Sequence, residues 1–220
     1  MDLDTTRSRN AYERIISDFE HGRIDILVGT QMVTKGLDFD RVSLVGILNA
    51  DNLLNFPDFR AHERSFQLMS QVAGRAGRKH KRGKVIIQTT KPEHQVIKQV
   101  VANNFEQLFK SQLIQRKTFR YPPYSRLLRI TLKHRNSRTL AVAARQLADN
   151  LRKRIGDMVL GPEAPLINRI QNYYIEEILL KLDRGVALPK AKVVIRQEMD
   201  RLLEYKPYGG LVISPDVDPM

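Results

Sequence analysis

The sequence predicts an α/β protein with two domains, residues 1–118 and residues 119–220. In the first part, short β-branched runs alternate with helical stretches, which is typical of a parallel sheet with helices on its faces. The segment 119–125, FRYPPYS, contains two consecutive prolines, which break any helix and mark the boundary between the domains. The second part has the predicted order β-α-β-β-α-β, the split βαβ arrangement of an α+β domain.

The first domain is predicted to contain three strands and three helical stretches. Its strand candidates are short apolar runs that end in polar or small residues, and its helix candidates carry apolar residues three and four positions apart. Because function in parallel sheets gathers at the carboxyl ends of strands, Gly29–Thr30 and Asn49–Asp51 are the first candidate positions. The predicted strands are residues 24–30, 42–51 and 84–90, and the predicted helical stretches are residues 7–21, 61–74 and 93–117.

The second domain begins with a strand over residues 126–133, RLLRITLK. Ser137 is then expected to cap a helix whose buried face repeats every three to four residues. Pro189 is expected to start a second helix that runs to about Tyr205. The buried face of the first helix is predicted to be Leu140, Ala144, Leu147, Leu151 and Ile155, and the remaining strands are predicted near MVLGPEAP, at residues 173–182 and in GGLVISPDVDP.

The composition favours a polyanionic partner. The 220 residues carry a formal net charge of +13, with a pI of about 10.1, and both predicted domains share the excess of cations. Such a balance is typical of nucleic-acid-binding proteins, and a basic but inert surface is the alternative. The sequence has no cysteine, which excludes disulfides and thiolate metal sites, and it has no apolar run long enough to span a membrane. We therefore expect a cytoplasmic protein.

Residues 71–78, QVAGRAGR, place two arginines three positions apart, each directly after a glycine. A guanidinium matches phosphate oxygens and never loses its charge, so Arg75 and Arg78 are suited to a bound nucleotide. In phosphoryl transfer such a group neutralises charge that develops in the transition state. The alternative is that Gly74 and Gly77 merely end a helix and that the arginines are solvated.

The pattern Q-x-x-G-R-x-G-R resembles the sixth conserved motif of superfamily 2 helicases and translocases. This resemblance implies that residues 1–118 form part of a RecA-like second helicase lobe. It also implies that Arg75 and Arg78 are catalytic arginine-finger groups and that Gln71 lies at the nucleotide.

Residues 28–39, VGTQMVTKGLDF, are similar to the fifth motif of the same superfamily. The resemblance implies that Thr30 holds a nucleic-acid phosphate and that Gly36 and Asp38 face ATP, with Asp38 accepting hydrogen bonds from the ribose hydroxyls. From the residues alone, Asp38 is better interpreted as a turn residue that caps a short helix. Lys35 either contacts a DNA phosphate or is solvated.

The segment ADNLLNFPDFRAHER narrows the resemblance to the primosomal protein N′ (PriA) family of replication-restart DNA helicases. YPPYSRLLRI, LGP at residues 160–162 and DVDP at residues 216–219 are similar to that family's C-terminal domain, so the resemblance covers essentially the whole chain. It implies an ATP-dependent 3′-to-5′ DNA helicase, with ATP and Mg²⁺ as cofactors, that restarts replication at stalled or branched forks and loads the primosome.

A complete motor also needs a phosphate-binding loop, G-x-x-x-x-G-K-[ST], and an acidic pair for Mg²⁺, and neither pattern occurs in this sequence. The family's zinc-binding insertion needs cysteines, so this chain holds no zinc ligands. We therefore expect a C-terminal fragment that binds DNA without hydrolysing ATP, and whose unpaired sheet edge favours self-association or a disordered N-terminus. The alternative is a non-catalytic module for branched DNA or protein with a degenerate motor lobe.

The second domain carries no catalytic constellation, but the resemblance implies partners for it. These are branched and single-stranded DNA, other primosome proteins, and the acidic, apolar-ended C-terminal tail of single-stranded DNA-binding protein. Such a tail needs cations beside an apolar groove. Lys190, Lys192 and Arg196, near the start of the last predicted helix, are the candidate residues for the tail. Tyr121 and Tyr124 either stack on bases or pack at the domain junction.

Overall fold

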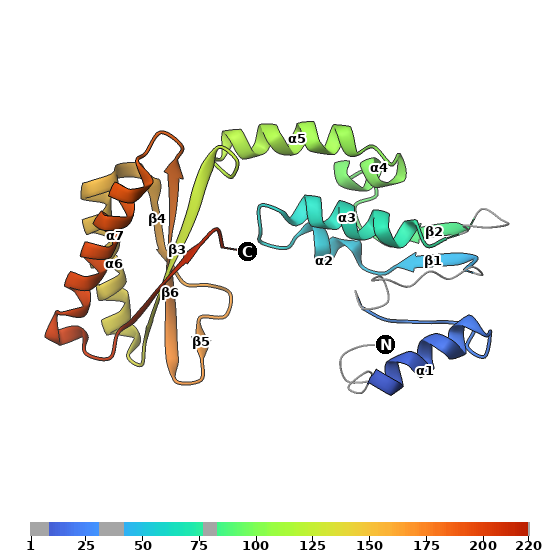
Figure 1. The fold of residues 1–220 in the computed structure, drawn as a ribbon, viewed down its shortest axis with the longest axis horizontal. Coiled ribbons are helices and arrows are strands. Elements are labelled where there is room, and N and C mark those ends of the chain that lie inside the picture. Colours follow the sequence, from blue (N-terminus) through green and yellow to red (C-terminus); the bar gives the residue numbers. More distant parts are fainter. Residues whose placement is uncertain (1–8, 31–41, 77–82, 220) are drawn as a thin grey trace. The chain divides into compact units, whose positions relative to one another are not determined.

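The computed structural model describes residues 9–30, 42–76 and 83–219, and the chain divides into two compact units, residues 1–112 and 113–220 (Figure 1). Each unit has a hydrophobic core of its own. The division falls within one helix, α5 (Phe105–Thr118). The domain boundary expected at residue 119 stays a prediction.

In the described residues, the first unit contains a parallel sheet of two strands, whereas the sequence predicted a parallel sheet with three. Strand β1 (Leu44–Ile47) pairs in parallel with β2 (Lys84–Ile87), with Leu44 opposite Lys84. The connection between them includes α2 (Ala50–Leu54) and α3 (Ala61–Ala73). Helix α1 (Arg9–Glu20) precedes the sheet, and α4 (Gln95–Val101) and then α5 follow it.

The core of the first unit lies between its helices and one side of the short sheet. Phe66 and Met69 of α3 are buried together with Val96 and Val100 of α4. Burial of a large apolar side chain stabilises a fold by about 1.5–3 kcal/mol, so this contact fixes the orientation of α3. The position of α3 matters because the arginine motif begins in its last turn.

The strand predicted over residues 24–30 is wrong, since these residues form no strand and the side chains of Ile26 and Val28 are 77% and 64% exposed. A strand needs a hydrogen-bonding neighbour, and in the described residues β1 pairs only with β2. The β-branched pattern of this run is therefore not sufficient to form a strand.

The second unit is an antiparallel sheet with two helices on the same side of it (Figure 1). The chain runs through β3 (Ser125–His134), α6 (Ser137–Ile155), β4 (Val159–Glu163), β5 (Arg169–Ile170), β6 (Tyr173–Asp183), α7 (Leu188–Leu203) and β7 (Val212–Val217). Short 3₁₀ turns at Gly156–Met158 and Lys206–Tyr208 follow α6 and α7. The strand order is β4-β6-β3-β7, and β5 pairs with β6.

The core of the second unit follows the predicted periodicities. Leu147 and Leu151 of α6 are fully buried against Ile178 and Leu180 of β6, and Ile130 of β3 is in the same cluster. The predicted helix cap is wrong by one position. Asn136, not Ser137, is the N-cap of α6, and its side-chain oxygen accepts a hydrogen bond from the backbone N–H of Thr139 at 3.1 Å.

Candidate nucleotide and nucleic-acid site

The arginine motif begins at the C-terminal end of α3. Gln71 is exposed in the last turn, Gly74 is the C-cap residue, and Arg75 follows with its side chain partly buried. The backbone N–H of Gly74 bonds to the carbonyl of Ser70 at 3.0 Å, which extends the helical pattern by one residue. Arg75 is thus attached to a helix whose other face is anchored in the core.

The backbone at Gly74 does not require a glycine. Its φ is −66°, an ordinary right-handed helical value that any residue adopts. A Cβ at this position would lie 3.4 Å from the Ser70 carbonyl oxygen, which is an ordinary contact distance. Gly74 therefore makes no turn that requires a glycine. Gly77, the other glycine of the motif, lies outside the described residues.

The structure describes only part of the predicted site. Thr30 is exposed at the end of the first described stretch. Lys35, Gly36, Asp38 and Arg78 lie outside the described residues, so their predicted roles stay predictions. Within the described part of the motif, Gln71 and Arg75 occupy the end of one helix.

Asp51 joins the carboxyl ends of the two parallel strands. It lies just after β1, in the first turn of α2, and its carboxylate accepts hydrogen bonds from both Thr89 and Thr90, which follow β2. The Thr89 hydroxyl donates to one carboxylate oxygen, and the Thr90 N–H and hydroxyl donate to the other at 2.8 and 2.7 Å. The candidate position Asn49–Asp51 therefore holds the strand ends together in this structure.

These hydrogen bonds predict an acid-sensitive contribution to stability. The Thr89 hydroxyl, followed by the two Thr90 donors, lowers the pKa of Asp51 from 3.8 to about 2. Because the folded-state pKa is depressed, the stabilisation is complete above pH 3.8 and is lost as the pH falls towards 2. Urea unfolding between pH 5 and about 2 should therefore show a steeper loss of stability in the wild type than in Asp51→Ala. Parallel curves for the two proteins would contradict this role of Asp51.

The candidate cations for a protein partner are exposed in the first half of α7. Lys190, Lys192 and Arg196 are all exposed, and the exposed side chain of Val193 lies among them on the helix surface. Arg196 makes a long contact of 3.9 Å with Asp200, which at such exposure contributes little. An apolar side chain flanked by cations is a suitable surface for an acidic peptide that ends in an apolar residue.

Two family models match the chain in succession. The model described as "Helicase conserved C-terminal domain" matches residues 2–80, and the model described as "Primosomal protein N C-terminal domain" matches residues 117–220. The chain belongs to the PriA family. The first match contains the arginine motif on α3, and the second contains the whole antiparallel sheet.

Curated PriA relatives align with the chain along its full length. The replication restart protein PriA of Bacillus subtilis is 40% identical over 221 residues, and those of Synechocystis and Treponema pallidum are each 38% identical. These alignments cover all of this chain but only 27%, 26% and 33% of the three relatives. The chain thus spans about a quarter to a third of the length of the PriA proteins that it matches.

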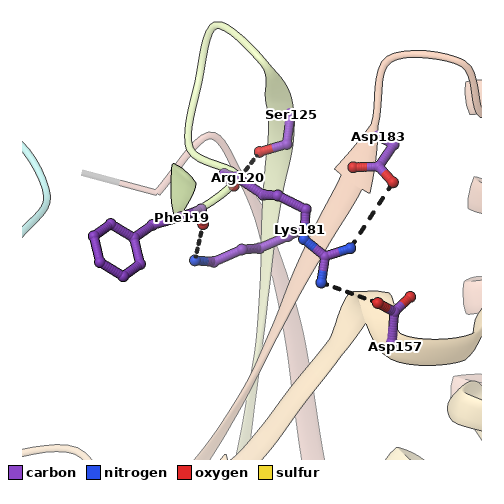
Figure 2. Close-up of polar contacts among 6 residues, drawn as sticks. All are labelled: Phe119, Arg120, Ser125, Asp157, Lys181 and Asp183. Carbon is purple, nitrogen blue, oxygen red and sulfur yellow. Dashed lines mark hydrogen bonds and ion pairs between the residues drawn. The ribbon is translucent and has the colours of Figure 1, made fainter. Parts of the chain in front are cut away.

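At the start of the PriA-type C-terminal domain, the segment before β3 is fixed to strand β6 by a buried lysine (Figure 2). Lys181 donates a hydrogen bond of 2.8 Å to the carbonyl of Phe119, and its ammonium lies 3.6 Å from the centre of the Tyr121 ring. Burial, together with the nearby charge of Arg120, lowers the pKa of Lys181. Tyr121 therefore packs against Lys181 within the second unit, and its two alternative roles, stacking on bases or packing at the domain junction, stay predictions.

Arg120 also helps to fix the segment before β3. Its guanidinium pairs with Asp157 at 3.1 Å and lies 4.0 Å from Asp183, and its carbonyl accepts a hydrogen bond from Ser125 at 2.6 Å (Figure 2). The sequence analysis missed this cluster. The only signal for it is a lysine at position 181 within the apolar residues 178–182 of β6.

The described residues contain no cluster of three or more His, Cys, Asp or Glu side chains that could hold a metal ion. No helix in the described part of the chain is long and apolar enough to cross a membrane.

Proposed function

We propose that this chain forms the second motor lobe and the C-terminal domain of an ATP-dependent 3′-to-5′ DNA helicase that restarts replication at stalled or branched forks and loads the primosome. The observation that carries the proposal is the succession of a helicase match and a PriA C-terminal match along one chain, with Arg75 held at the end of a core-anchored helix. Both parts are basic, which suits a DNA partner.

In this proposal, Arg75 and Arg78 act on a triphosphate that another lobe holds. The sequence of this chain has no phosphate-binding loop, so the β- and γ-phosphates and Mg²⁺ need backbone amides and carboxylates from elsewhere. Gln71, Gly36 and Asp38 would contact the nucleotide from this side, and Thr30 and Lys35 would contact DNA phosphates. The chain alone is then a DNA-binding protein without ATP hydrolysis.

We further infer that the second unit is a split βαβ domain. In support, β6 lies between β3 and β4 and is antiparallel to both, while α6 and α7 cover one side of the sheet. The addition of β7 on the far side of β3 gives the β-α-β-β-α-β order, with β5 as an extra two-residue strand. This arrangement leaves the second side of the sheet free of helices within the unit.

The surface of α7 is the proposed site for the C-terminal tail of single-stranded DNA-binding protein. The tail's carboxylates would pair with Lys190, Lys192 and Arg196, and its apolar end would contact Val193. Charge-assisted hydrogen bonds of this kind are stronger than neutral ones, and one apolar anchor fixes the position of the peptide.

The experiment that tests the proposal measures DNA binding and ATP hydrolysis by the purified chain. Fluorescence anisotropy with a forked oligonucleotide should show affinity that falls about tenfold or more between 50 and 200 mM salt, because each neutralised phosphate releases counterions. No DNA-stimulated release of phosphate from ATP should be detectable. ATP hydrolysis by the chain, or DNA binding that is absent or indifferent to salt, would contradict the proposal. DNA binding together with Arg75 and Arg78 variants that leave a two-lobed protein fully active would favour the non-catalytic module.

A further inference from the structure

One end of the sheet in the second unit brings together two segments that are distant in sequence. At the end of β3, Lys133 lies opposite Ile175 and His134 lies opposite Tyr174. In the adjacent hairpin, Arg169 of β5 lies opposite the same Tyr174, and Ile170 lies opposite Tyr173. Residues 133–138 and 166–174 therefore meet at Tyr174 of β6, with β3 on one edge of that strand and β5 on the other, and we name this pair of segments the basic corner.

The sequence in and next to the basic corner contains cationic residues but no acidic ones. Residues 133–148 and 164–175 contain no aspartate or glutamate, but they contain Lys133, Arg135, Arg138, Arg145 and Arg169. The nearest carboxylates along β6 already have cationic neighbours. Burial raises the pKa of Glu176 and the charge of Arg145 opposes that shift, while Glu177 lies 4.0 Å from Arg129.

The opposite end of the same sheet carries carboxylates, but these lie beside arginines. Asp157 and Asp183 lie there around Arg120, and Asp216 pairs with Arg129 at 3.0 Å. A polyanion that approaches the sheet therefore meets carboxylates at that end and only cations at the basic corner, which favours binding at the corner.

Two arginines of the basic corner lie over tyrosine rings. The Arg135 guanidinium carbon is 5.5 Å from the centre of the Tyr173 ring, and that of Arg169 is 5.0 Å from the centre of the Tyr174 ring. Within the described parts of the chain, neither arginine forms an ion pair with a carboxylate. Each side chain is exposed beside its ring, so its planar guanidinium offers a cationic surface on which a base can stack.

The corner also exposes apolar side chains that phosphate binding does not explain. Leu166, Ile167 and Ile170 are 88%, 68% and 52% exposed. Phosphates need only cations and polar donors, whereas nucleobases present flat apolar faces. A duplex hides those faces in its stack, so a surface that combines cations, aromatic rings and aliphatic side chains fits an unpaired strand.

We propose that the basic corner binds the unpaired bases of single-stranded DNA, with Tyr173 and the flat guanidinium of Arg135 as the stacking surface and Leu166 and Ile167 as its apolar border. This inference rests on the DNA binding proposed above and adds to it a base-stacking site. It assigns unpaired DNA to one end of the sheet, distinct from the peptide surface on α7.

The first test needs no substitution. The affinity of the wild-type chain is measured for a 15-nucleotide oligothymidylate and for an abasic strand of the same length and charge, at one salt concentration. Stacking contributes about 1–3 kcal/mol per base, so the oligothymidylate should bind about tenfold more tightly. Equal affinities would overturn the basic corner but leave the proposed DNA binding intact. Failure to bind either strand would overturn both.

Variants then locate the stacking surface. Tyr173→Ala should lose about tenfold in affinity for the oligothymidylate and nothing for the abasic strand, and Tyr173→Phe should behave as wild type.

Arg135→Ala combined with Arg169→Ala should weaken binding of both strands and reduce the slope of log affinity against log salt by about 1.4. Lys153→Ala combined with Arg184→Ala removes the same charge at exposed positions outside the basic corner and should leave binding within about twofold. Circular dichroism of each variant establishes that it is folded. Unchanged binding by folded Tyr173→Ala would show that no base stacks on this ring, and would overturn the proposal.

Discussion

Replacing Arg75 with alanine is expected to lower DNA-stimulated ATP hydrolysis by about a thousandfold or more, in a protein where this chain is joined to a lobe that holds the triphosphate. The reason is that Arg75 follows the C-cap residue of α3, and Phe66 and Met69 of this helix are fixed in the core. The position of Arg75 is therefore set before the nucleotide binds. A charged group held in place in advance stabilises the transition state without reorganisation during the reaction. The measurement is the steady-state rate of phosphate release at saturating single-stranded DNA.

The controls for this experiment separate charge, geometry and stability. Arg75→Lys keeps the charge but loses the planar fork, so it should recover only a small part of the rate. Arg14→Ala removes an exposed arginine from α1 in the same unit, and should leave the rate unchanged. DNA affinity and thermal stability should change little in all three proteins. Retention of more than a tenth of the wild-type rate by Arg75→Ala would exclude a direct role for Arg75 in phosphoryl transfer.

Features that depend on local pattern could be predicted from the sequence. The apolar period of α6 predicted Leu147 and Leu151 as core residues, and the apolar runs at β1 and β2 predicted a parallel pair. Pairing itself is not local, which is why residues 24–30 have the composition of a strand but form none. The predicted cap of α6 was wrong by one position because Asn136 and Ser137 are both suitable capping residues. Their order gives no reason to choose between them.

The candidate site was predictable only where one segment contains it. Arg75 and Gln71 lie in one short segment with Met69, a core position of α3, and the three cations of α7 share another helix. A motif or a spacing is therefore enough to find them. Lys181 and the Phe119 carbonyl are far apart in sequence, as are Arg135 and Tyr173, and each pair meets only through the register of β3 with β6. Sequence patterns could identify these residues as basic or aromatic, but not as partners.

A substitution at Gly161, where β4 pairs with β6, is expected to have a second large effect, a loss of stability. Gly161 has a φ of +89°, and it lies where the pairing shifts between Leu160 and Glu163. A Cβ added there would lie 2.8 Å from the backbone carbonyl oxygen of Glu177 and 3.2 Å from the backbone nitrogen of Glu163. Neither backbone atom can move away without breaking the strand pairing. Gly161→Ala should therefore lower the free energy of unfolding by about 3 kcal/mol or more, from unfavourable φ combined with steric overlap.

A series of three glycine variants separates the two causes. Gly156 has a φ of +69° and no atom within 4 Å of its added Cβ, so Gly156→Ala reports the conformational cost alone, about 1–2 kcal/mol. Gly185 has neither a positive φ nor a neighbour within 4 Å, so Gly185→Ala should change stability by no more than about 0.5 kcal/mol. Urea unfolding followed by circular dichroism measures all three. If Gly161→Ala is no less stable than Gly156→Ala, the backbone of β6 must yield to the new methyl group, and the close approach of β4 to β6 does not require a glycine at position 161.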